Sequence, residues 1–242
     1  MNEEKLKNPG TSNGPRQDFR RRLVLGTALA TSAFFGGYRG YIRRAFADCA
    51  PPGGTYTCSG ATTTTQTLSG TPLVVTTAPG FSIDTTASGG YAFKLSGTDG
   101  LTFTDRHNST IAGYASGIMA YNYGSGALSI TTTGKVSAGL YDGISARNYG
   151  TDLIIHSAAV SGGGNYGINA WNEGSGALSI TATGTVTGGV NSHGILARNE
   201  GTDLTIEAAS ISGGRDGIFA DNNGGGALSI KATGKVTGAQ FD

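Results

Sequence analysis

The densest group of side chains with chemistry to offer lies between residues 99 and 107. It contains two carboxylates and two basic groups: Asp99, Asp105, Arg106 and His107. Carboxylates clustered with basic residues on one outer face perform the acid–base steps in enzymes that degrade polysaccharides. The spacing does not fix which way these side chains face, and a charged turn explains the same residues. We therefore predict no catalytic residue here.

Three histidines and two cysteines are the other candidates for catalysis or metal binding. His156 takes the place of Glu207 in a related segment, and His193 takes the place of Asp142, which indicates solvated surface positions. No His-x-x-x-His or Cys-x-x-Cys pair is present for a metal, and no Gly-x-Ser-x-Gly motif for a nucleophile. The sequence therefore predicts no enzyme, no metal site and no cofactor.

An eight-residue pattern, Gly-Ile-x-Ala-x-Asn-x-Gly, occurs five times and organises the chain. The copies begin at residues 117, 143, 167, 194 and 217, so they lie 26, 24, 27 and 23 residues apart. Repeats of about this length are typical of stacked structural units. Alternate copies are most alike, because Gly-Ala-Leu-Ser-Ile follows at 126, 176 and 226, and Gly-Thr-Asp-Leu at 150 and 201. The full repeat is therefore two units.

Each unit contains three short runs in which apolar residues alternate with polar ones. In the first unit these runs cover 118–120, 128–130 and the residues around Val136. Alternation with period two predicts half-buried strands, and the Gly- and Ser-rich segments between the runs predict turns. Three strands in about 25 residues predict one coil of an all-β, right-handed parallel β-helix, a solenoid whose coils stack about 4.8 Å apart.

The glycines and asparagines of the pattern are predicted to shape the corners of the coils. Glycine suits a corner where a Cβ would clash or where φ must be positive. One asparagine recurs in every copy, and two interpretations are open: a hydrogen-bonded ladder from coil to coil, or tolerance of a left-handed turn. Both are architectural. The residues are Asn122, Asn148, Asn172, Asn199 and Asn222.

One column of outward positions is the best candidate for a binding surface. The fourth residue after the leading glycine is Tyr121, Arg147, Trp171 and Arg198 in successive copies. Stacking in register makes them neighbours, with cation–π attraction of about 0.5–1 kcal/mol per exposed contact. The column either only stabilises the surface or forms a stripe that binds sugars or a partner. Under the second interpretation, replacing Trp171 and Tyr121 by Ser should abolish glycan retention.

The first 47 residues have the layout of a secretory signal. Three arginines at 20–22 precede the apolar residues 23–37, and Ala47 and Asp48 flank the expected cleavage site. The apolar run is short for a membrane span, so we expect export across the inner membrane. Two alternatives stay open: an uncleaved leader that acts as an anchor, and export by the twin-arginine route rather than the general route.

The chain after the leader is acidic. Residues 48–242 contain eight Lys and Arg against thirteen Asp and Glu, a net charge of −5, which argues against nucleic-acid binding.

Cys49 and Cys58 follow the expected cut, and a pair this close in an exported chain predicts a disulfide loop. Residues 60–112 have weaker strand patterns, which we interpret as degenerate capping coils. The chain is therefore predicted to have three parts: the leader (1–47), the disulfide loop with the degenerate capping coils (48–112), and the regular coils (113–242).

With these features in order, the chain resembles the N-terminal part of a bacterial autotransporter, the type V secretion family. The resemblance rests on the segment from Cys49 to Gly60 and on the Gly-, Asn- and Thr-rich coils that follow, and it covers residues 20–242. The family implies a passenger that a C-terminal β-barrel carries to the cell surface. This chain has no series of alternating ten-residue strands for such a barrel, so the barrel is expected from a longer or neighbouring product.

The resemblance and the repeats together predict a structural and adhesive stalk. Expected partners are host matrix, glycans or further copies of the chain. Expected locations are the periplasm, the outer membrane and cell surface, or the outside of the cell. Two other functions stay open: a β-helix enzyme that degrades polysaccharides, which release of unsaturated sugars would reveal, and an inactive truncated gene product.

Overall fold

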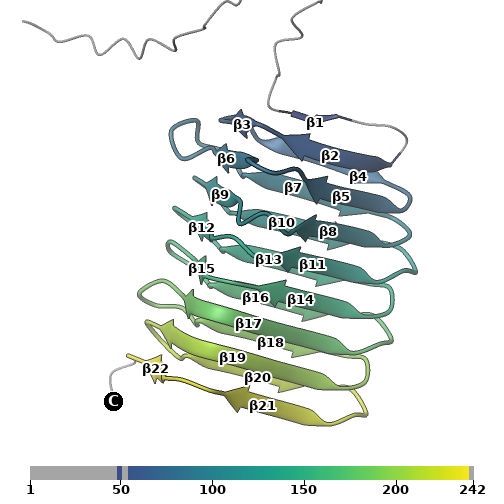
Figure 1. Ribbon diagram of the computed structural model, residues 1–242. Coiled ribbons are helices and arrows are strands. Elements are labelled where there is room, and N and C mark those ends of the chain that lie inside the picture. The colour runs from purple at the N-terminus through teal and green to yellow at the C-terminus, as the bar shows by residue number, and fades with distance from the viewer. Residues whose placement is uncertain (1–47, 51–53, 240–242) are drawn as a thin grey trace, which may run out of the picture. The chain divides into compact units, whose positions relative to one another are not determined.

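The computed structural model describes residues 48–50 and 54–239, and every regular element within these ranges is a β-strand. The strands form seven stacked coils, each of which turns through three strand directions, and the last two strands begin an eighth (Figure 1). The predicted all-β solenoid is confirmed. The predicted leader, residues 1–47, lies outside the described residues, and so does Ala47 at its expected cut.

One side of the stack is a parallel seven-stranded sheet, sheet B, to which each coil contributes one strand. Its pairing aligns equivalent residues of the repeat, such as Ile118 with Ile144 and Ile144 with Ile168. Every position of the repeat therefore forms a column along the stack. The strands are β4 (Gln66–Gly70), β7 (Phe93–Gly97), β10 (Ile118–Asn122), β13 (Ile144–Asn148), β16 (Ile168–Asn172), β18 (Ile195–Asn199) and β20 (Ile218–Asn222).

The other two sides belong to one fifteen-stranded sheet that bends into two arms. Arm A1 contains β2 (Thr55–Ser59), β5 (Leu73–Thr77), β8 (Leu101–Asp105), β11 (Leu128–Thr132), β14 (Leu153–Ser157) and β21 (Leu228–Ala232). Arm A2 contains β3 (Ala61–Thr62), β6 (Ser82–Asp84), β9 (Thr110–Gly113), β12 (Val136–Ala138), β15 (Val160–Ser161) and β22 (Val236–Gly238). Two long strands run through the bend and belong to both arms, β17 (Leu178–Thr187) and β19 (Leu204–Gly213).

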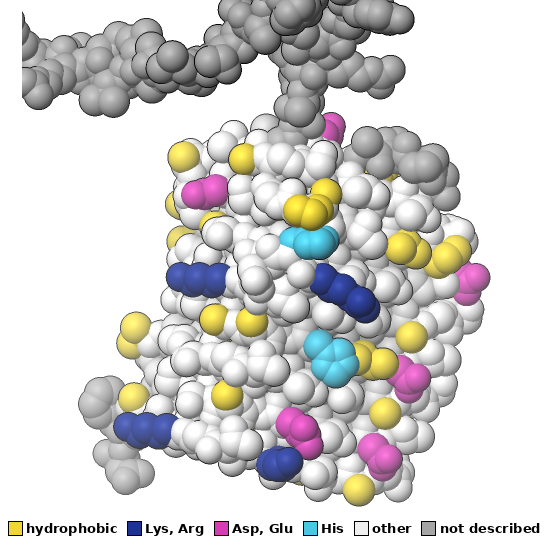
Figure 2. All heavy atoms as spheres, viewed as in Figure 1, with side chains coloured by type: hydrophobic (Ala, Val, Ile, Leu, Met, Phe, Trp, Pro, Cys, Tyr) yellow, Lys and Arg dark blue, Asp and Glu magenta, His cyan; other side chains and the backbone are white. Residues whose placement is uncertain are grey.

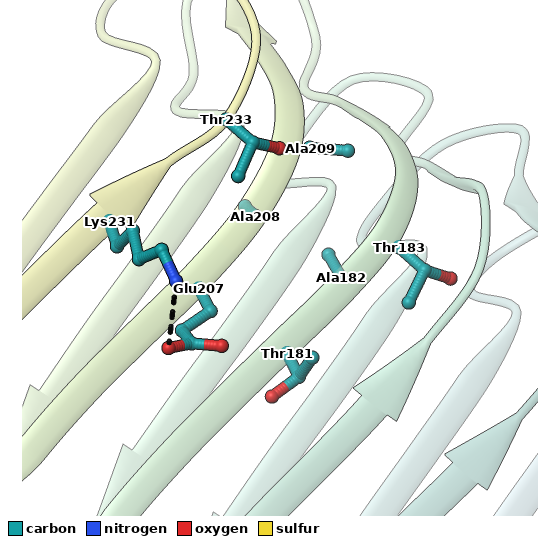
Figure 3. Close-up of a pocket in the computed structure, with 8 residues that line it drawn as sticks. All are labelled: Thr181, Ala182, Thr183, Glu207, Ala208, Ala209, Lys231 and Thr233. Carbon is teal, nitrogen blue, oxygen red and sulfur yellow. Dashed lines mark ion pairs between the residues drawn. The ribbon is translucent and has the colours of Figure 1, made fainter.

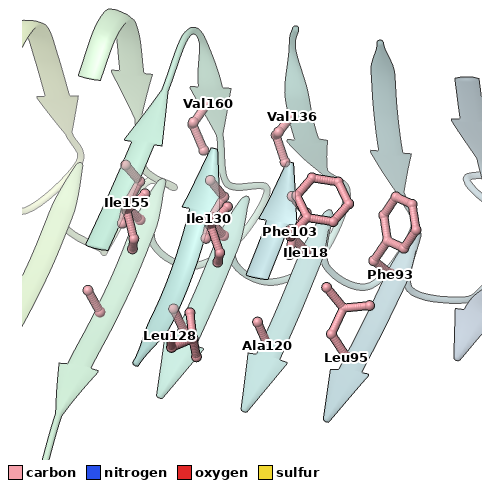
Figure 4. Close-up of a cluster of buried hydrophobic side chains, with 14 of the residues drawn as sticks. Phe93, Leu95, Phe103, Ile118, Ala120, Leu128, Ile130, Val136, Ile155 and Val160 are labelled. Carbon is pink, nitrogen blue, oxygen red and sulfur yellow. The ribbon is translucent and has the colours of Figure 1, made fainter. Parts of the chain in front are cut away.

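Apolar side chains fill the interior in columns, as the three alternating runs predicted. Ile118, Leu128 and Val136, one from each run, have no exposed area. Figure 4 shows these columns beside Phe93 and Phe103, whose ring centroids lie 5.0 Å apart. The two phenylalanines occupy positions that the next coil fills with isoleucine. Burying each such side chain contributes roughly 1.5–3 kcal/mol.

The leading glycine of the pattern is required because coils approach too closely for a Cβ. A Cβ on Gly143 would lie 2.5 Å from Val160 Cγ1 and 2.8 Å from the Gly167 carbonyl oxygen, both in the next coil. The glycines with positive φ lie elsewhere, outside the repeated corners. Of the two reasons offered by the sequence, steric exclusion is therefore the one that applies.

The repeated asparagines form a hydrogen-bonded ladder inside the corner that follows sheet B. Asn122 Nδ2 donates to Asn148 Oδ1 at 2.8 Å, and three equivalent bonds continue the chain to Asn222 at 2.8–2.9 Å. Each amide also donates to a backbone carbonyl, as Asn172 does to Gly176 at 3.1 Å. None of the five residues has a positive φ, so the left-handed-turn interpretation is wrong.

The N-terminal end of the stack is closed by a short antiparallel strand, β1 (Asp48–Ala50), which pairs with β2. Cys49 and Cys58 lie opposite each other in this pair and form a disulfide. Both cysteines are buried against the core. The Cys49 N–H also donates to Gln66 Oε1 at 3.2 Å. The disulfide therefore ties β1 to the first coil.

Candidate binding surface

The outward column of sheet B brings together the four residues that the sequence singled out. Tyr121 pairs with Arg147, Arg147 with Trp171, and Trp171 with Arg198 on adjacent strands. All four side chains are half-buried, which is the expected state for long side chains that lie flat against their neighbours.

Trp171 lies between two guanidinium groups. Arg147 Cζ is 4.4 Å from the centroid of the indole ring, and Arg198 Cζ is 5.4 Å from it. The arginines come from the preceding and following coils, so they contact the ring from both axial directions. These contacts favour a stabilising ladder by roughly 0.5–1 kcal/mol each.

Three further rings extend the column into a continuous surface. The rings of Tyr121 and Tyr123 lie 5.8 Å apart and those of Tyr123 and Tyr149 lie 5.9 Å apart, with planes 9° and 15° from parallel. Arg147 Cζ lies 5.0 Å from Tyr149, and Arg198 Cζ lies 5.9 Å from Phe219. We call the seven residues the aromatic strip: Tyr121, Tyr123, Arg147, Tyr149, Trp171, Arg198 and Phe219.

Sequence reasoning missed two tyrosines of the strip because they follow the strand. Tyr123 and Tyr149 come directly after the inward asparagine, so the period-two alternation already pointed them outward. They are also among the most exposed members, at 58% and 39%, with Phe219 at 37%. Burial raises the pKa of the Tyr121 hydroxyl, and Tyr123 adds to this effect, so that hydroxyl stays protonated at neutral pH.

The two arginines of the strip differ in how their charge is compensated. Arg147 Nε donates to Glu173 Oε1 at 2.6 Å, and its Nη2 contacts the same oxygen. Arg198 makes no ion pair within 4.0 Å in the described ranges, and its buried Nε has no hydrogen-bond partner there. Arg198 is therefore the uncompensated charge of the strip.

A second stack of rings lies at the edge of sheet B and joins the strip at Phe219. His193 lies between Tyr166 and Phe219, with ring centroids at 5.5 Å and 5.2 Å. Its Nδ1 is 2.9 Å from Asp216 Oδ2, without the alignment of a hydrogen bond. Burial lowers the pKa of His193 and outweighs the opposing effect of Asp216. The imidazole is therefore neutral at pH 7.

The sequence predicted solvated surface positions for both His156 and His193. The prediction is confirmed for His156 and wrong for His193. His193 is 5% exposed because the two flanking rings cover it, whereas His156 points outward from arm A1 and is exposed. Asp142, in the equivalent corner, is buried as well. Burial raises the pKa of Asp142, and hydrogen bonds from Asn169 Nδ2 and the Tyr166 N–H only partly oppose this.

The residues between 99 and 107 do not form one site. Asp99 lies two residues before β8 and Asp105 is its last residue, and β8 alone is roughly 13 Å long at the usual rise of a strand. Asp99 accepts a hydrogen bond from Ser125. Asp105 points inward, where it is fully buried. The two carboxylates therefore cannot act together on one bond.

A shallow groove follows the bend between the two arms, on the side shown in Figure 2. Its best-defined part is lined by Thr181, Thr183, Glu207, Lys231 and neighbouring alanines, and Figure 3 shows these side chains projecting from adjacent strands. Glu207 is the one carboxylate in this lining, and Lys231 Nζ lies 3.8 Å from its Oε1. Threonines and His156 line the adjoining part. This lining offers hydroxyl groups but no pair of carboxylates.

Comparisons with protein-family models, curated proteins and solved structures found no match to this chain. Within 48–50 and 54–239, no helix is long and apolar enough to cross a membrane. No group of three or more metal-binding side chains gathers in those ranges. The protein is thus a parallel β-solenoid with an aromatic and cationic strip on one sheet.

Proposed function

We propose that this chain is the passenger of an exported, autotransporter-like protein and serves as a structural stalk that adheres through sheet B. The aromatic strip is the observation that carries the proposal. Tyrosine, tryptophan and arginine supply large contact area with little conformational freedom to lose, and they dominate the energetics of known interfaces. A paired sheet holds them at fixed spacing, which keeps the entropic penalty of binding low.

The distribution of exposed apolar side chains supports sheet B as the contact surface. Apart from three residues of the last coil, every large exposed apolar side chain of the described ranges lies on sheet B or on a corner beside it. They are Tyr114, Tyr123, Leu140, Tyr141, Tyr149, Val190 and Phe219. The outer surface of arm A1 instead carries mostly threonine, serine and scattered charges, with smaller apolar areas at Val74 and Ile154 (Figure 2). Exposed apolar area concentrated on one side favours an interaction surface there.

The proposal is tested by retention of the chain on immobilised matrix proteins and glycans. The variant Tyr123→Ser/Tyr149→Ser/Phe219→Ser removes the three most exposed rings of the strip and should reduce retention at least tenfold. These residues are better probes than Trp171, whose ring is covered by two arginines. The control variant, Val74→Ser/Ile154→Ser, removes two half-buried apolar side chains from the outer surface of arm A1 and should bind as wild type does. Equal retention by wild type and the strip variant would contradict the proposal.

The enzyme hypothesis has one structural feature in its favour, the groove between the arms. Hydrolysis with two carboxylates needs both groups on the same bond, and the described lining of the groove supplies Glu207 alone. We therefore rank adhesion above catalysis. Release of unsaturated or reducing sugars from polysaccharides by the wild-type chain, lost in Glu207→Gln, would reverse that order.

A further inference from the structure

We propose that the surface bound by the strip is a carboxylated polysaccharide, whose acidic group pairs with Arg198. This inference rests on the proposed function and names the chemistry of its ligand. It comes from a difference between Arg147 and Arg198, which occupy equivalent positions of the repeat. Arg147 is paired with a carboxylate of the chain, and Arg198 is not.

The Arg147 position shows how this column holds a carboxylate. Glu173 follows the inward Asn172 in the next coil, and from there it contacts both Nε and Nη2 of Arg147. Charge-assisted pairs of this kind are among the strongest hydrogen bonds in proteins. The geometry places the carboxylate beside a guanidinium that already lies against Trp171.

The Arg198 position lacks that internal partner. The residue equivalent to Glu173 in the coil after Arg198 is Asn223, which also directly follows the inward asparagine. Asp221 is the register neighbour of Arg198, but its Oδ2 accepts a hydrogen bond from Asn223 Nδ2 at 3.2 Å and makes no ion pair with the guanidinium. The place that a carboxylate fills beside Arg147 is thus taken beside Arg198 by the neutral amide of Asn223.

The surroundings of Arg198 favour a sugar over an acidic peptide. Trp171 and Phe219 flank the guanidinium at 5.4 Å and 5.9 Å, and aromatic rings next to a charged donor suit a ligand that combines apolar C–H faces with an acidic group. The backbone of β18 is paired on both sides, with β16 and β20. An extended peptide therefore finds no free strand edge at Arg198 to pair with.

General attraction to polyanions does not explain such binding, because the chain after residue 47 has a net charge of −5. The charge that recognises the ligand must therefore be local. This makes selectivity between acidic and neutral polymers a direct readout of the site.

The test compares retention on immobilised hyaluronate, dextran and polyglutamate for the wild-type chain and four variants. Asn223→Glu supplies the missing internal carboxylate at the position equivalent to Glu173. It should weaken hyaluronate binding about tenfold, the worth of one charge-assisted pair, with the melting temperature unchanged or raised. Arg198→Gln should give the same loss by removing the charge. Asn223→Gln, the neutral control, should bind as wild type does.

The Arg147 site provides a variant in which hyaluronate binding should become stronger. Glu173→Gln frees Arg147 from its internal partner and should strengthen hyaluronate binding several-fold. Hyaluronate binding as strong as that of wild type in either Asn223→Glu or Arg198→Gln would overturn the proposal. Retention of the wild-type chain on dextran equal to its retention on hyaluronate would overturn it as well. Retention on polyglutamate as strong as on hyaluronate would replace the sugar by an acidic peptide. Loss of retention on every surface by the wild-type chain would instead count against adhesion itself.

Discussion

At the residue scale, Asp105 is the clearest case of a group whose environment decides its role. Burial by itself raises its pKa, but hydrogen bonds from the Thr77 and Ser109 hydroxyls and from the backbone N–H groups of His107 and Ser109 outweigh burial and hold the pKa below the usual range. Thr132 and the Gly134 N–H donate to the same carboxylate. A carboxylate with so many donors is a fixed structural centre that joins three coils.

Replacing Asp105 by Asn should destabilise the fold by roughly 2–3 kcal/mol at pH 7, because a charged acceptor is lost from a buried set of donors. The pKa is lower in the folded than in the unfolded chain, so this stabilisation is present above about pH 4 and disappears as the pH falls through the folded pKa. Thermal unfolding of both proteins at pH 7 and pH 3 measures the difference, which should shrink in acid.

Asp84 provides the matched control for this prediction. Its pKa is also lowered, by hydrogen bonds from the Thr86 side chain and backbone N–H, but the carboxylate is exposed. Asp84→Asn should therefore leave the melting temperature nearly unchanged. A loss in Asp84→Asn as large as that in Asp105→Asn would show that burial of the acceptor is not the source of the effect.

At the element scale, the asparagine ladder explains why the corner after sheet B is the same in every coil. An inward asparagine satisfies backbone carbonyls of its own turn and passes one hydrogen bond to the next coil. Buried amides must be paired in this way, since an unpaired polar group inside the stack costs about 1–3 kcal/mol. The ladder therefore fixes the register as well as adding to stability.

Asn172→Ala should cost about 3 kcal/mol, because it removes ladder bonds on both sides and leaves the amide of Asn148 without its acceptor. Asn222→Ala, in a more exposed position, breaks a ladder bond on one side and should cost less than half as much. Equilibrium unfolding in urea measures both. Equal losses would contradict a cooperative ladder and favour independent turns.

The disulfide between β1 and β2 is expected to stabilise the first coil. Replacing Cys49 and Cys58 together by Ser should cost on the order of 2–3 kcal/mol, the chain-entropy value for a loop of this size. Proteolysis should then begin near β1 and β2 while the coils from β10 onward stay protected. Protection of β1 and β2 in the double variant equal to wild type would show that pairing alone closes this end.

The sequence predicted the coils well because their information is local and repeated. The alternating runs around Ile118, Leu128 and Val136 became strands with inward side chains, and the outward column assembled from Tyr121 to Arg198 as expected. Burial of His193 could not be predicted, since it depends on Tyr166 and Phe219 from neighbouring coils. The pairing of Arg147 with Glu173 was missed for the same reason.

At the scale of the whole molecule, the solenoid separates two kinds of surface. The two arms present hydroxyl groups and scattered charges, whereas sheet B and its corners present the rings, the aliphatic side chains and one uncompensated guanidinium. Stability in such a stack accumulates between neighbouring coils. The outer columns are consequently free to vary, and a contiguous strip across five coils is a feature of the surface rather than a requirement of the fold.

Radical footprinting of the chain bound to a surface that retains it is the most direct measurement of whether sheet B is the contact surface. Our account predicts that Tyr123, Tyr149 and Phe219 become protected from oxidation on binding, while His156, exposed on the outer surface of arm A1, keeps the rate of the free chain. Protection confined to arm A1 or to the groove between the arms, with the rings of the strip still oxidised at the free rate, would contradict it.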